Sequence, residues 1–341
     1  MGMRAIEYSQ TGSADVLKLV DRTPPTPGAD EVVVRIAVSA VNPTDWKARA
    51  GSGDGATLPQ PQVPNQDGAG TVESIGQGVT SLAVGDRVWV WDAAYQRVDG
   101  TAQELTLMPA ARVVPLPDGV SFDVGASMGI PALTAHRALT AREGGPTELT
   151  PGALDDSVVL VSGGAGAVGH AAIQLAVWAG ATVLTTVSSD EKAELARAAG
   201  AQHVLNYKTE DVAALVSEIA PHGVDVVVEV NALANLELDL DLLAMGGTIS
   251  VYGAAGTDRP ALPVRPAMVK NARLQFLMTY TTTAEQKASA IRSVNAAAAA
   301  GALEVGAEHG LPLTRFPLER TADAHRAVEN DVVGKVLIDV G

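Results

Sequence analysis

Short β-branched runs separated by turn residues are the main pattern in roughly the first 130 residues. Residues 50–66 differ, because they are rich in glycine, proline and polar side chains, and they predict a mobile loop without regular structure. The short β-branched runs predict β-strands. They occur at residues 32–38 (VVVRIAV), 68–76 (GAGTVESIG), 86–91 (DRVWVW) and 111–117 (ARVVPLP).

From residue 132 onward, apolar strands alternate with helical segments. Residues 170–180 and 190–200 predict helices that each end at a glycine. This alternation indicates βαβ units, and therefore a parallel sheet with helices on both faces. The chain then closes with predicted helices at 284–300 and 321–329 and a strand at 335–340. Strands of the alternating region are expected at residues 158–161, 182–187, 203–207, 224–230 and 247–253.

A glycine-rich turn lies between the first of these strands and the first helix. Its sequence, GAGAVG, has the G-x-G-x-x-G spacing of a dinucleotide-binding loop in its expected strand–helix setting. Such glycines permit a tight turn, close approach of the backbone to a pyrophosphate, and close packing of helix on strand. The helix N-terminus offers N–H groups to the phosphates, and a turn that only packs the helix is the alternative. The residues expected to bind the phosphates are Gly164, Ala165, Gly166, Ala167, Val168 and Gly169.

The end of the second strand bears on which dinucleotide is bound. An NAD site usually carries an acid there, which accepts a hydrogen bond from the ribose 2′-OH. Here the strand ends in two serines, and the acids come only afterwards, where Ser188 and Glu191 have the spacing of a capping box. Ser189 and Lys192 are therefore expected to face a 2′-phosphate, which favours NADPH over NADH, although Lys192 could equally be a solvated helix lysine.

Composition and charge narrow the class of protein. The chain has 341 residues, of which 47% are hydrophobic, and its net charge of −15 disfavours nucleic acid or an anionic membrane as a partner. It contains no cysteine, which excludes disulfides, thiolate chemistry and cysteine-built metal sites. Residues 157–189 carry no charged side chain, but glycines interrupt them near their start, so a buried strand–loop–helix–strand unit explains them better than a membrane span. The N-terminus has no apolar signal core, and we expect a cytoplasmic protein.

A serine hydrolase is the rival enzyme class. Residues 125–129 read GASMG and match the G-x-S-x-G pattern around a nucleophilic serine. That pattern needs a strand before the serine and a helix after it. The preceding residues 117–124 (PDGVSFDV) indicate a turn into a helix instead, so Ser127 is not expected to be a nucleophile.

Several motifs spread along the chain resemble the zinc-free branch of the medium-chain dehydrogenase/reductase superfamily, the quinone oxidoreductase and zeta-crystallin group. No single motif would be specific, but together they cover nearly the whole chain. The motifs are AVNPTDWKARAG (40–51), VGDRV (84–88), GIPALTAHRAL (129–139), VSGGAGAVG (161–169), AGAQHVLNY (199–207), LLAMGGTISVYG (242–253) and GKVLIDV (334–340).

The resemblance implies an α/β fold with two domains. One is a GroES-like β-rich catalytic domain, expected to be discontinuous and to comprise residues 1–131 and 275–341. The other is a Rossmann domain with a doubly wound parallel sheet, expected over residues 132–274, which binds NADPH. The family is usually homodimeric, and residues 273–280 (RLQFLMTY) could form an interface strand or be part of the core.

The resemblance also assigns cofactor residues beyond the glycine loop. Lys192 matches a lysine that binds the 2′-phosphate, and Tyr207 matches a tyrosine beside that phosphate. Lys335 lies where the C-terminal segment returns to the cofactor cleft. The residues implied on the nicotinamide side are Thr134, Tyr252, Gly253 and Met278.

At the metal positions of zinc-dependent relatives this chain differs. Asn42 stands where those relatives have their first cysteine ligand, and residues 65–67 read Asn-Gln-Asp instead of Gly-His-Glu. The six histidines show no paired ligand spacing. No catalytic zinc is therefore expected.

Hydride transfer without a Lewis acid requires an acceptor that is already electron-poor. A quinone fits, because the incoming charge delocalises over its ring, and the expected function is NADPH-dependent quinone reduction. Asn42 and Tyr280 are the candidate catalytic hydrogen-bond donors, with Tyr95 as a weaker one in the pocket. Related quinone reductases have a tyrosine where this chain reads Trp46-Lys47, so the substrate pocket is altered. Reduction of α,β-unsaturated carbonyl compounds and a non-catalytic, crystallin-like NADPH-binding role are the alternatives.

Overall fold

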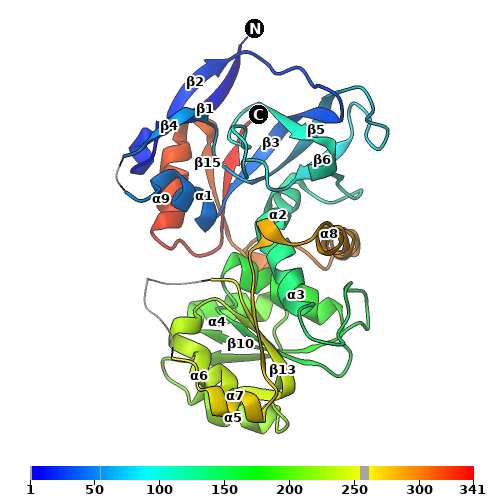
Figure 1. The fold of residues 1–341 in the computed structure, drawn as a ribbon, viewed down its shortest axis with the longest axis vertical. Helices are drawn as coiled ribbons and strands as arrows, with labels where there is room; N and C mark the ends of the chain where they lie inside the picture. Colours follow the sequence, from blue (N-terminus) through cyan, green and yellow to red (C-terminus); the bar gives the residue numbers. More distant parts are fainter. Residues whose placement is uncertain (1, 54, 254–260) are drawn as a thin grey trace. The chain divides into compact units, whose positions relative to one another are not determined.

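The structure is a computed structural model that describes residues 2–53, 55–253 and 261–341 (Figure 1). It divides into two compact units, Met1–Ile130 with Leu313–Gly341, and Pro131–Pro312. The return to the first unit thus comes at residue 313, whereas it was expected at residue 275. Residues 275–312 belong to the second unit, where for example Ser293 Oγ bonds to His136 Nε2 at 3.1 Å and accepts from Leu149 N at 2.9 Å.

The first unit is built on a mainly antiparallel sheet. Its order is β15-β16-β3-β5-β6-β8, and β7 pairs with the first half of β3. In the central strand β3, Val32, Val34 and Ile36 pack in the main core cluster, and Val33 on the opposite face packs in a smaller one, so both faces of the strand are covered. The strands are β3 (Glu31–Val41), β5 (Asp67–Ile75), β6 (Arg87–Val90), β7 (Leu105–Pro109), β8 (Val113–Pro115), β15 (Leu313–Pro317) and β16 (Lys335–Asp339).

A smaller sheet in this unit corrects one expectation. Residues 50–66 were predicted to lack regular structure, but Thr57–Gln62 form strand β4, which pairs with β1 (Met3–Gln10); β1 also pairs with β2 (Lys18–Arg22). The prediction was wrong because it counted the prolines of β4 as strand breakers. β4 lies at the edge of its sheet, where missing N–H groups are tolerated.

Three helices complete the part of the first unit that bears on the site. Helix α1 (Pro43–Ala50) follows β3 directly, and α9 (Thr321–Glu329) packs on α1 and on β16. Helix α2 (Phe122–Leu139) contains the boundary between the two units. Ser127 lies inside α2, where its hydroxyl donates to the Asp123 carbonyl at 2.7 Å, so it does not occupy a strand-to-helix elbow.

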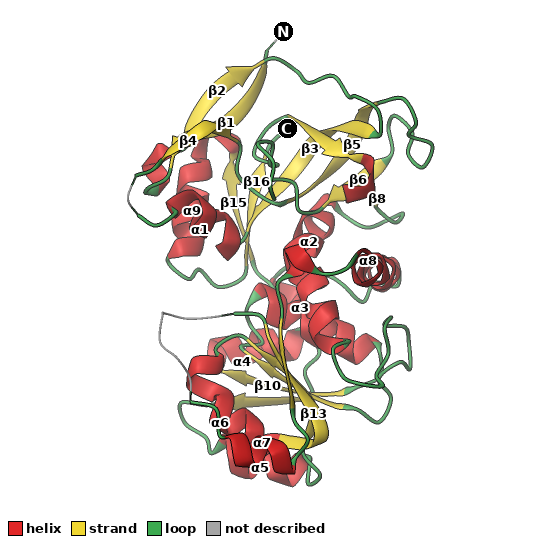
Figure 2. Cartoon of the chain, viewed as in Figure 1, coloured by secondary structure: helices red, strands yellow, loops and turns green. Residues whose placement is uncertain are grey.

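The second unit contains the predicted parallel sheet. Its order is β11-β10-β9-β12-β13-β14, and every pair is parallel. Along the chain these strands alternate with helices, and Figure 2 shows the strands of this sheet with helices around them. The order reverses between β9 and β12, which makes the carboxyl ends of these strands the switch point of the sheet. The strands are β9 (Val158–Ser162), β10 (Thr182–Val187), β11 (His203–Asn206), β12 (Val224–Glu229), β13 (Leu243–Val251) and β14 (Arg273–Phe276).

The helices of the second unit agree with the predicted ones to within a few residues. The largest difference is at the glycine loop, where α3 begins three residues before the predicted start at 170. Together the two units confirm the predicted fold class, a β-rich domain and a Rossmann domain. The helices are α3 (Ala167–Trp178), α4 (Asp190–Ala198), α5 (Val212–Ile219), α6 (Ala232–Leu242), α7 (Val264–Val269) and α8 (Ala284–Ala299).

Within the described ranges, no helix has the length and apolarity needed to cross a membrane.

Candidate functional site

The glycine loop closes tightly against its own strands in the second unit. A Cβ atom on Gly164 would lie 2.2 Å from Oγ1 of Thr185 on the neighbouring strand β10, and one on Gly169 would lie 2.4 Å from the Gly163 carbonyl. Neither Gly164 nor Gly169 can be replaced by a larger residue without displacing strand β10 or the backbone of the loop. At Gly166, in contrast, the nearest atom is the Gly163 carbonyl at 3.4 Å, which is ordinary contact. The protein itself therefore requires glycine at positions 164 and 169 but not at 166.

The N-terminus of α3 opens at this loop. Gly166 is its N-cap, and no described side chain caps the helix there. The first-turn N–H groups of Ala167, Val168 and Gly169 have no acceptor inside the helix. Together with the helix dipole, such groups favour a phosphate. A loop that needs small residues and an uncapped helix end fit a dinucleotide pyrophosphate.

The end of β10 lies next to this loop. Ser189 is the N-cap of α4 and accepts from Lys192 N at 3.3 Å, so the predicted N-cap at Ser188, with its capping box to Glu191, was wrong. Lys192 Nζ donates to Ser188 Oγ at 3.2 Å, which holds the ammonium over the strand end. Tyr207 N bonds to the Val187 carbonyl at 3.1 Å, and its side chain is half-exposed. The structure thus brings Ser189, Lys192 and Tyr207 to one edge of the sheet.

The predicted nicotinamide-side residues lie elsewhere in the second unit. Thr134 is buried in α2. Tyr252 and Gly253 follow β13, and Tyr252 N donates to the Glu229 carbonyl at 3.0 Å; burial raises the pKa of the Tyr252 hydroxyl. Met278 is exposed, and Tyr280 is half-buried in the short 3₁₀ helix Thr279–Thr281.

A second polar cluster is buried in the first unit, and it centres on Asn42. The Asn42 amide nitrogen donates to Asp67 Oδ2 at 2.8 Å, and its oxygen accepts from Lys335 Nζ at 2.6 Å. The Asn42 backbone N–H donates to Asp45 Oδ2 at 2.6 Å. All four side chains are at most 3% exposed. Lys335, which the resemblance placed at the cofactor, therefore has its ammonium inside this cluster.

The sheet register explains how distant residues meet here. Strand β3 ends just before Asn42, with β16 paired on one side of it and β5 on the other. Lys335 begins β16 and Asp67 begins β5, so both flank the end of β3. Asp45 sits in the first turn of α1, where a carboxylate accepts the N-cap N–H.

Burial and mutual charge set the protonation of the cluster. Desolvation, with a further contribution from Asp67, raises the pKa of Asp45 to about 7. Desolvation likewise raises the pKa of Asp67 to about 6, against the opposing pull of Lys335. Desolvation lowers the pKa of Lys335, although the two carboxylates act to raise it. The protonation of each of these three groups therefore depends on the charges of the other two.

Comparison with known proteins decides the family. Residues 28–118 match a family model described as alcohol dehydrogenase GroES-like domain, and residues 167–296 match one described as zinc-binding dehydrogenase. The quinone oxidoreductase of Rattus norvegicus is 32% identical over an alignment of 348 positions. The alignment covers 98% of this chain and 97% of the relative. The chain belongs to the quinone oxidoreductase family of medium-chain dehydrogenases/reductases. The resemblance drawn from the motifs is confirmed.

Solved structures of the family agree over the whole length. A mycobacterial protein complexed with NADPH is 31% identical, with a TM-score of 0.79, over 98% of this chain and 99% of the other. The Escherichia coli quinone oxidoreductase complexed with NADPH is 27% identical, with the same TM-score and coverage. Both have the fold described above.

The zinc named by one family model does not fit the residues of this chain. At Asn42, which the motif resemblance matches to the first zinc ligand, the side-chain oxygen is already bonded to the ammonium of Lys335. A second cation beside it would be repelled. Of the described residues, no three His, Cys, Asp or Glu side chains are grouped to hold a metal.

The predicted substrate-pocket residues lie in the first unit. Trp46 is half-buried on α1, and Lys47 is exposed, with its Nζ 5.8 Å from the centre of the Trp46 ring. Tyr95 is half-buried in the loop after β6, where Gln96 Nε2 donates to its hydroxyl at 3.4 Å. Sequence reasoning missed Asp45 entirely. The only signal for it was its place three residues after Asn42 at the start of a helix.

Proposed function

We propose that this chain is an NADPH-dependent quinone oxidoreductase that works without zinc. The observation that carries the proposal is the glycine loop. Gly164 and Gly169 leave no room for a side chain, and the uncapped end of α3 lies directly behind them. The names of the full-length relatives support the reaction class, and the two NADPH complexes support the cofactor.

For NADPH binding we assign roles to residues that lie on one edge of the sheet. The first-turn N–H groups of α3 hold the pyrophosphate. Lys192, with Ser189 and Tyr207 beside it, holds the 2′-phosphate; a cation there favours NADPH over NADH. Tyr252, Gly253, Thr134 and Met278 are proposed for the nicotinamide side. When bound, NADPH supplies the hydride.

For the acceptor, the residues favour a compound that needs no Lewis acid. Lys335 Nζ donates a hydrogen bond to Asn42 Oδ1, so its ammonium is not placed to polarise an unactivated ketone. Trp46 has a half-buried aromatic face on which a flat ring can stack. Tyr280, Tyr95 and Lys47 remain proposed acceptor contacts. One hydrogen of the Asn42 side-chain amide is donated to Asp67 Oδ2. Asn42 can therefore donate to a bound quinone only through the second amide hydrogen.

The test is NADPH oxidation by purified, chelator-treated protein with an ortho-quinone and a 2-alkenone in parallel. Faster turnover of the quinone, with NADH a poor donor, is expected. Turnover of the alkenone alone would move the assignment to an ene-reductase. NADPH binding with neither acceptor reduced would favour the non-catalytic role, and loss of activity on chelation would contradict the zinc-free proposal.

We also propose a homodimer and a cytoplasmic location. Strand β14 is the edge of its sheet, and apolar side chains on it, before it and after it in the chain are exposed. An exposed edge strand of this kind pairs readily with a second copy. The exposed residues are Leu262, Val264, Met268, Val269, Phe276 and Met278.

A further inference from the structure

Two carboxyl groups are buried together at the switch point of the parallel sheet. Glu229 is the last residue of β12, and Asp239 lies on α6; they are 0% and 2% exposed. The Asp239 carboxyl faces that of Glu229, and its Oδ2 is buried with no donor among the described residues, so the two groups can hydrogen-bond to each other only if one of them carries a proton. No described lysine, arginine or histidine pairs with either of them.

Polar neighbours connect this pair to the glycine loop. Asn235 Nδ2 lies 3.2 Å from both oxygens of Glu229 and 3.2 Å from Ser162 Oγ. Ser162 is the last residue of β9 and also bonds to Glu229; Gly163 follows it. The Glu229 carboxylate further accepts from Asn231 N. One hydrogen-bonded group therefore joins the ends of β9 and β12 to the first turns of α6.

Val230 follows Glu229 in the chain and lies beside the glycine loop, where the dinucleotide is proposed to bind. A Cβ atom on Gly163 would meet Val230 Cγ1 at 3.4 Å, and one on Gly253 would lie 2.4 Å from the Val230 carbonyl. Val230 thus fits between the glycine loop and the Tyr252–Gly253 segment. A shift at the end of β12 would disturb both.

We propose that Glu229 and Asp239 are a positioning pair for NADPH, in which one shared proton keeps the glycine loop and the Val230 segment in binding geometry. The proposal rests on the proposed NADPH-binding function. With the proton in place, the Asp239 acid donates to the Glu229 carboxylate, which keeps its other bonds to Asn235, Asn231 and Ser162. When the proton leaves to solvent, two like charges face each other in a site without a cation, and the pair must separate.

The titration range of the pair makes the proposal testable. Burial, and then the charge of Glu229, raises the pKa of Asp239 to about 9. Among the described residues, the titratable group that faces the pair is Tyr252, and Ser162, Asn231 and Asn235 are uncharged donors to Glu229. Burial also raises the pKa of Glu229. The proton is therefore kept at neutral pH and lost in mild alkali.

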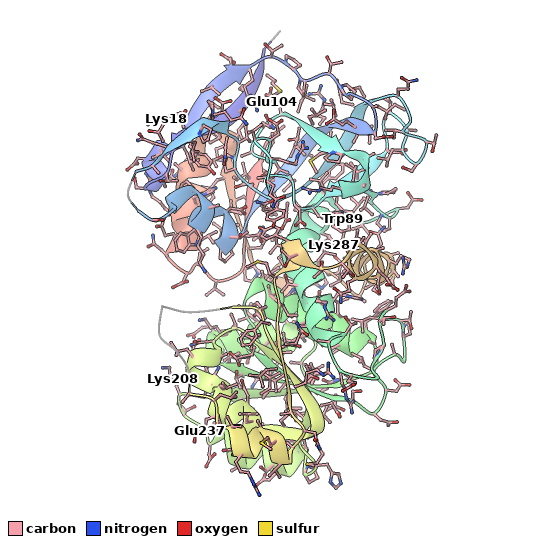
Figure 3. All side chains as sticks on the ribbon, in the orientation of Figure 1. Lys18, Trp89, Glu104, Lys208, Glu237 and Lys287 are labelled. Carbon is pink, nitrogen blue, oxygen red and sulfur yellow. The ribbon has the colours of Figure 1, made fainter. Side chains whose placement is uncertain are left out.

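The experiment compares the NADPH dissociation constant of three proteins between about pH 7 and pH 10. Asp239→Asn places an N–H donor where the acid proton was and cannot ionise. Glu237→Gln, at an exposed position on the same helix (labelled in Figure 3), is the matched control. At about pH 7.5 all three should bind alike, whereas at about pH 10 the wild type and Glu237→Gln should bind about tenfold more weakly than Asp239→Asn.

Equal alkaline loss in all three proteins, or loss of binding by folded Asp239→Asn at neutral pH, would overturn the proposal. A wild type that does not bind NADPH at all would refute the proposed function as well. If Asp239→Asn does not fold, infrared spectroscopy of the wild type tests the proposal instead. A protonated carboxyl should be present at neutral pH and disappear near pH 9, and saturating NADPH should move that midpoint upward. A midpoint that NADPH leaves unchanged would overturn the proposal.

Discussion

Lys335 Nζ and Asn42 Oδ1 are 2.6 Å apart although the residues are separated by 293 positions in the chain. The same Asn42 amide donates to Asp67, so a single neutral side chain lies between a buried cation and a buried carboxylate. A neutral bridge of this kind spreads the opposite charges through hydrogen bonds and removes the need for a direct ion pair. The position that the motif resemblance matches to a zinc ligand of zinc-dependent relatives here holds the C-terminal strand to the centre of the sheet.

Replacement of Lys335 by methionine should destabilise the protein strongly. The change leaves Asp45 and Asp67 buried without their cation, which costs about 3–5 kcal/mol of unfolding free energy. Without the cation the pKa values of both carboxyl groups should rise further. A carboxyl pKa that is raised on folding gives stability at low pH that is lost as the pH rises, so the deficit should be larger at about pH 8 than at about pH 5.

Urea unfolding of Lys335→Met and of Lys18→Met checks this. Lys18 is exposed on β2 (Figure 3), and its loss should change the unfolding free energy by less than about 0.5 kcal/mol. A deficit in Lys335→Met that does not vary with pH would contradict the charge-balance account of the cluster.

Two glycines of the dinucleotide loop should respond differently to alanine. Gly164→Ala places a Cβ 2.2 Å from Thr185 Oγ1 and should lower the melting temperature by several degrees. Gly166→Ala has room, so its melting temperature should stay near that of the wild type. If a pyrophosphate lies on this loop, Gly166→Ala should nevertheless weaken NADPH binding at least about tenfold. Unchanged binding by folded Gly166→Ala would mean that no ligand approaches the backbone there.

Lys192→Gln should change the choice between the two nicotinamide cofactors. Loss of the ammonium removes a charge-assisted contact to a 2′-phosphate and should raise the KM for NADPH about tenfold to a hundredfold. NADH lacks that phosphate and serves as the internal control, with its KM nearly unchanged. A parallel rise for both cofactors would indicate a role for Lys192 in folding or in binding of their common part.

His325 should make the protein sensitive to acid. Burial, and then the charge of Arg49, lowers its pKa to about 3, and its Nε2 lies 2.9 Å from Asn65 Oδ1, to which it donates. The folded histidine stays neutral while the unfolded one takes up a proton near pH 6.5. The resulting stability is complete above that pH and is lost as the pH falls toward the folded pKa.

His325→Gln keeps an amide donor for Asn65 but cannot titrate. Below about pH 6 the wild type should lose about 1 kcal/mol more per pH unit than this variant in guanidinium unfolding. His222→Gln, at an exposed position, is the control and should follow the wild type. Parallel curves for the wild type and His325→Gln would show that His325 does not contribute to acid unfolding.

Phe276→Glu should convert the proposed dimer to a monomer. Phe276 is 70% exposed on the edge strand β14, and a charge at the centre of an apolar contact is strongly unfavourable. Light scattering after size exclusion should give twice the chain mass for the wild type and for Val84→Glu, a change at an exposed residue of the first unit. A wild type that is monomeric at all concentrations would refute the dimer.

Local features were predictable from the sequence alone. The alternation of strands and helices, the glycine loop and helix α9 at Thr321–Glu329 depend on the spacing of residues only a few positions apart, and this spacing determines backbone conformation directly. The absence of cysteine and the replacement of zinc ligands are likewise properties of single positions. These features sufficed to recognise the family.

Only the tertiary structure decided which distant charges meet. Lys335 and Asp67 reach Asn42 because β16 and β5 pair on opposite sides of β3, and a register shift of one residue would separate them. Glu229 and Asp239 meet because α6 folds back on β12. Strand β4 was missed because its prolines are tolerated only at a sheet edge, and a sequence does not state which strands are edges. Burial and mutual charge, which set the protonation of all these groups, arise only when the chain has folded.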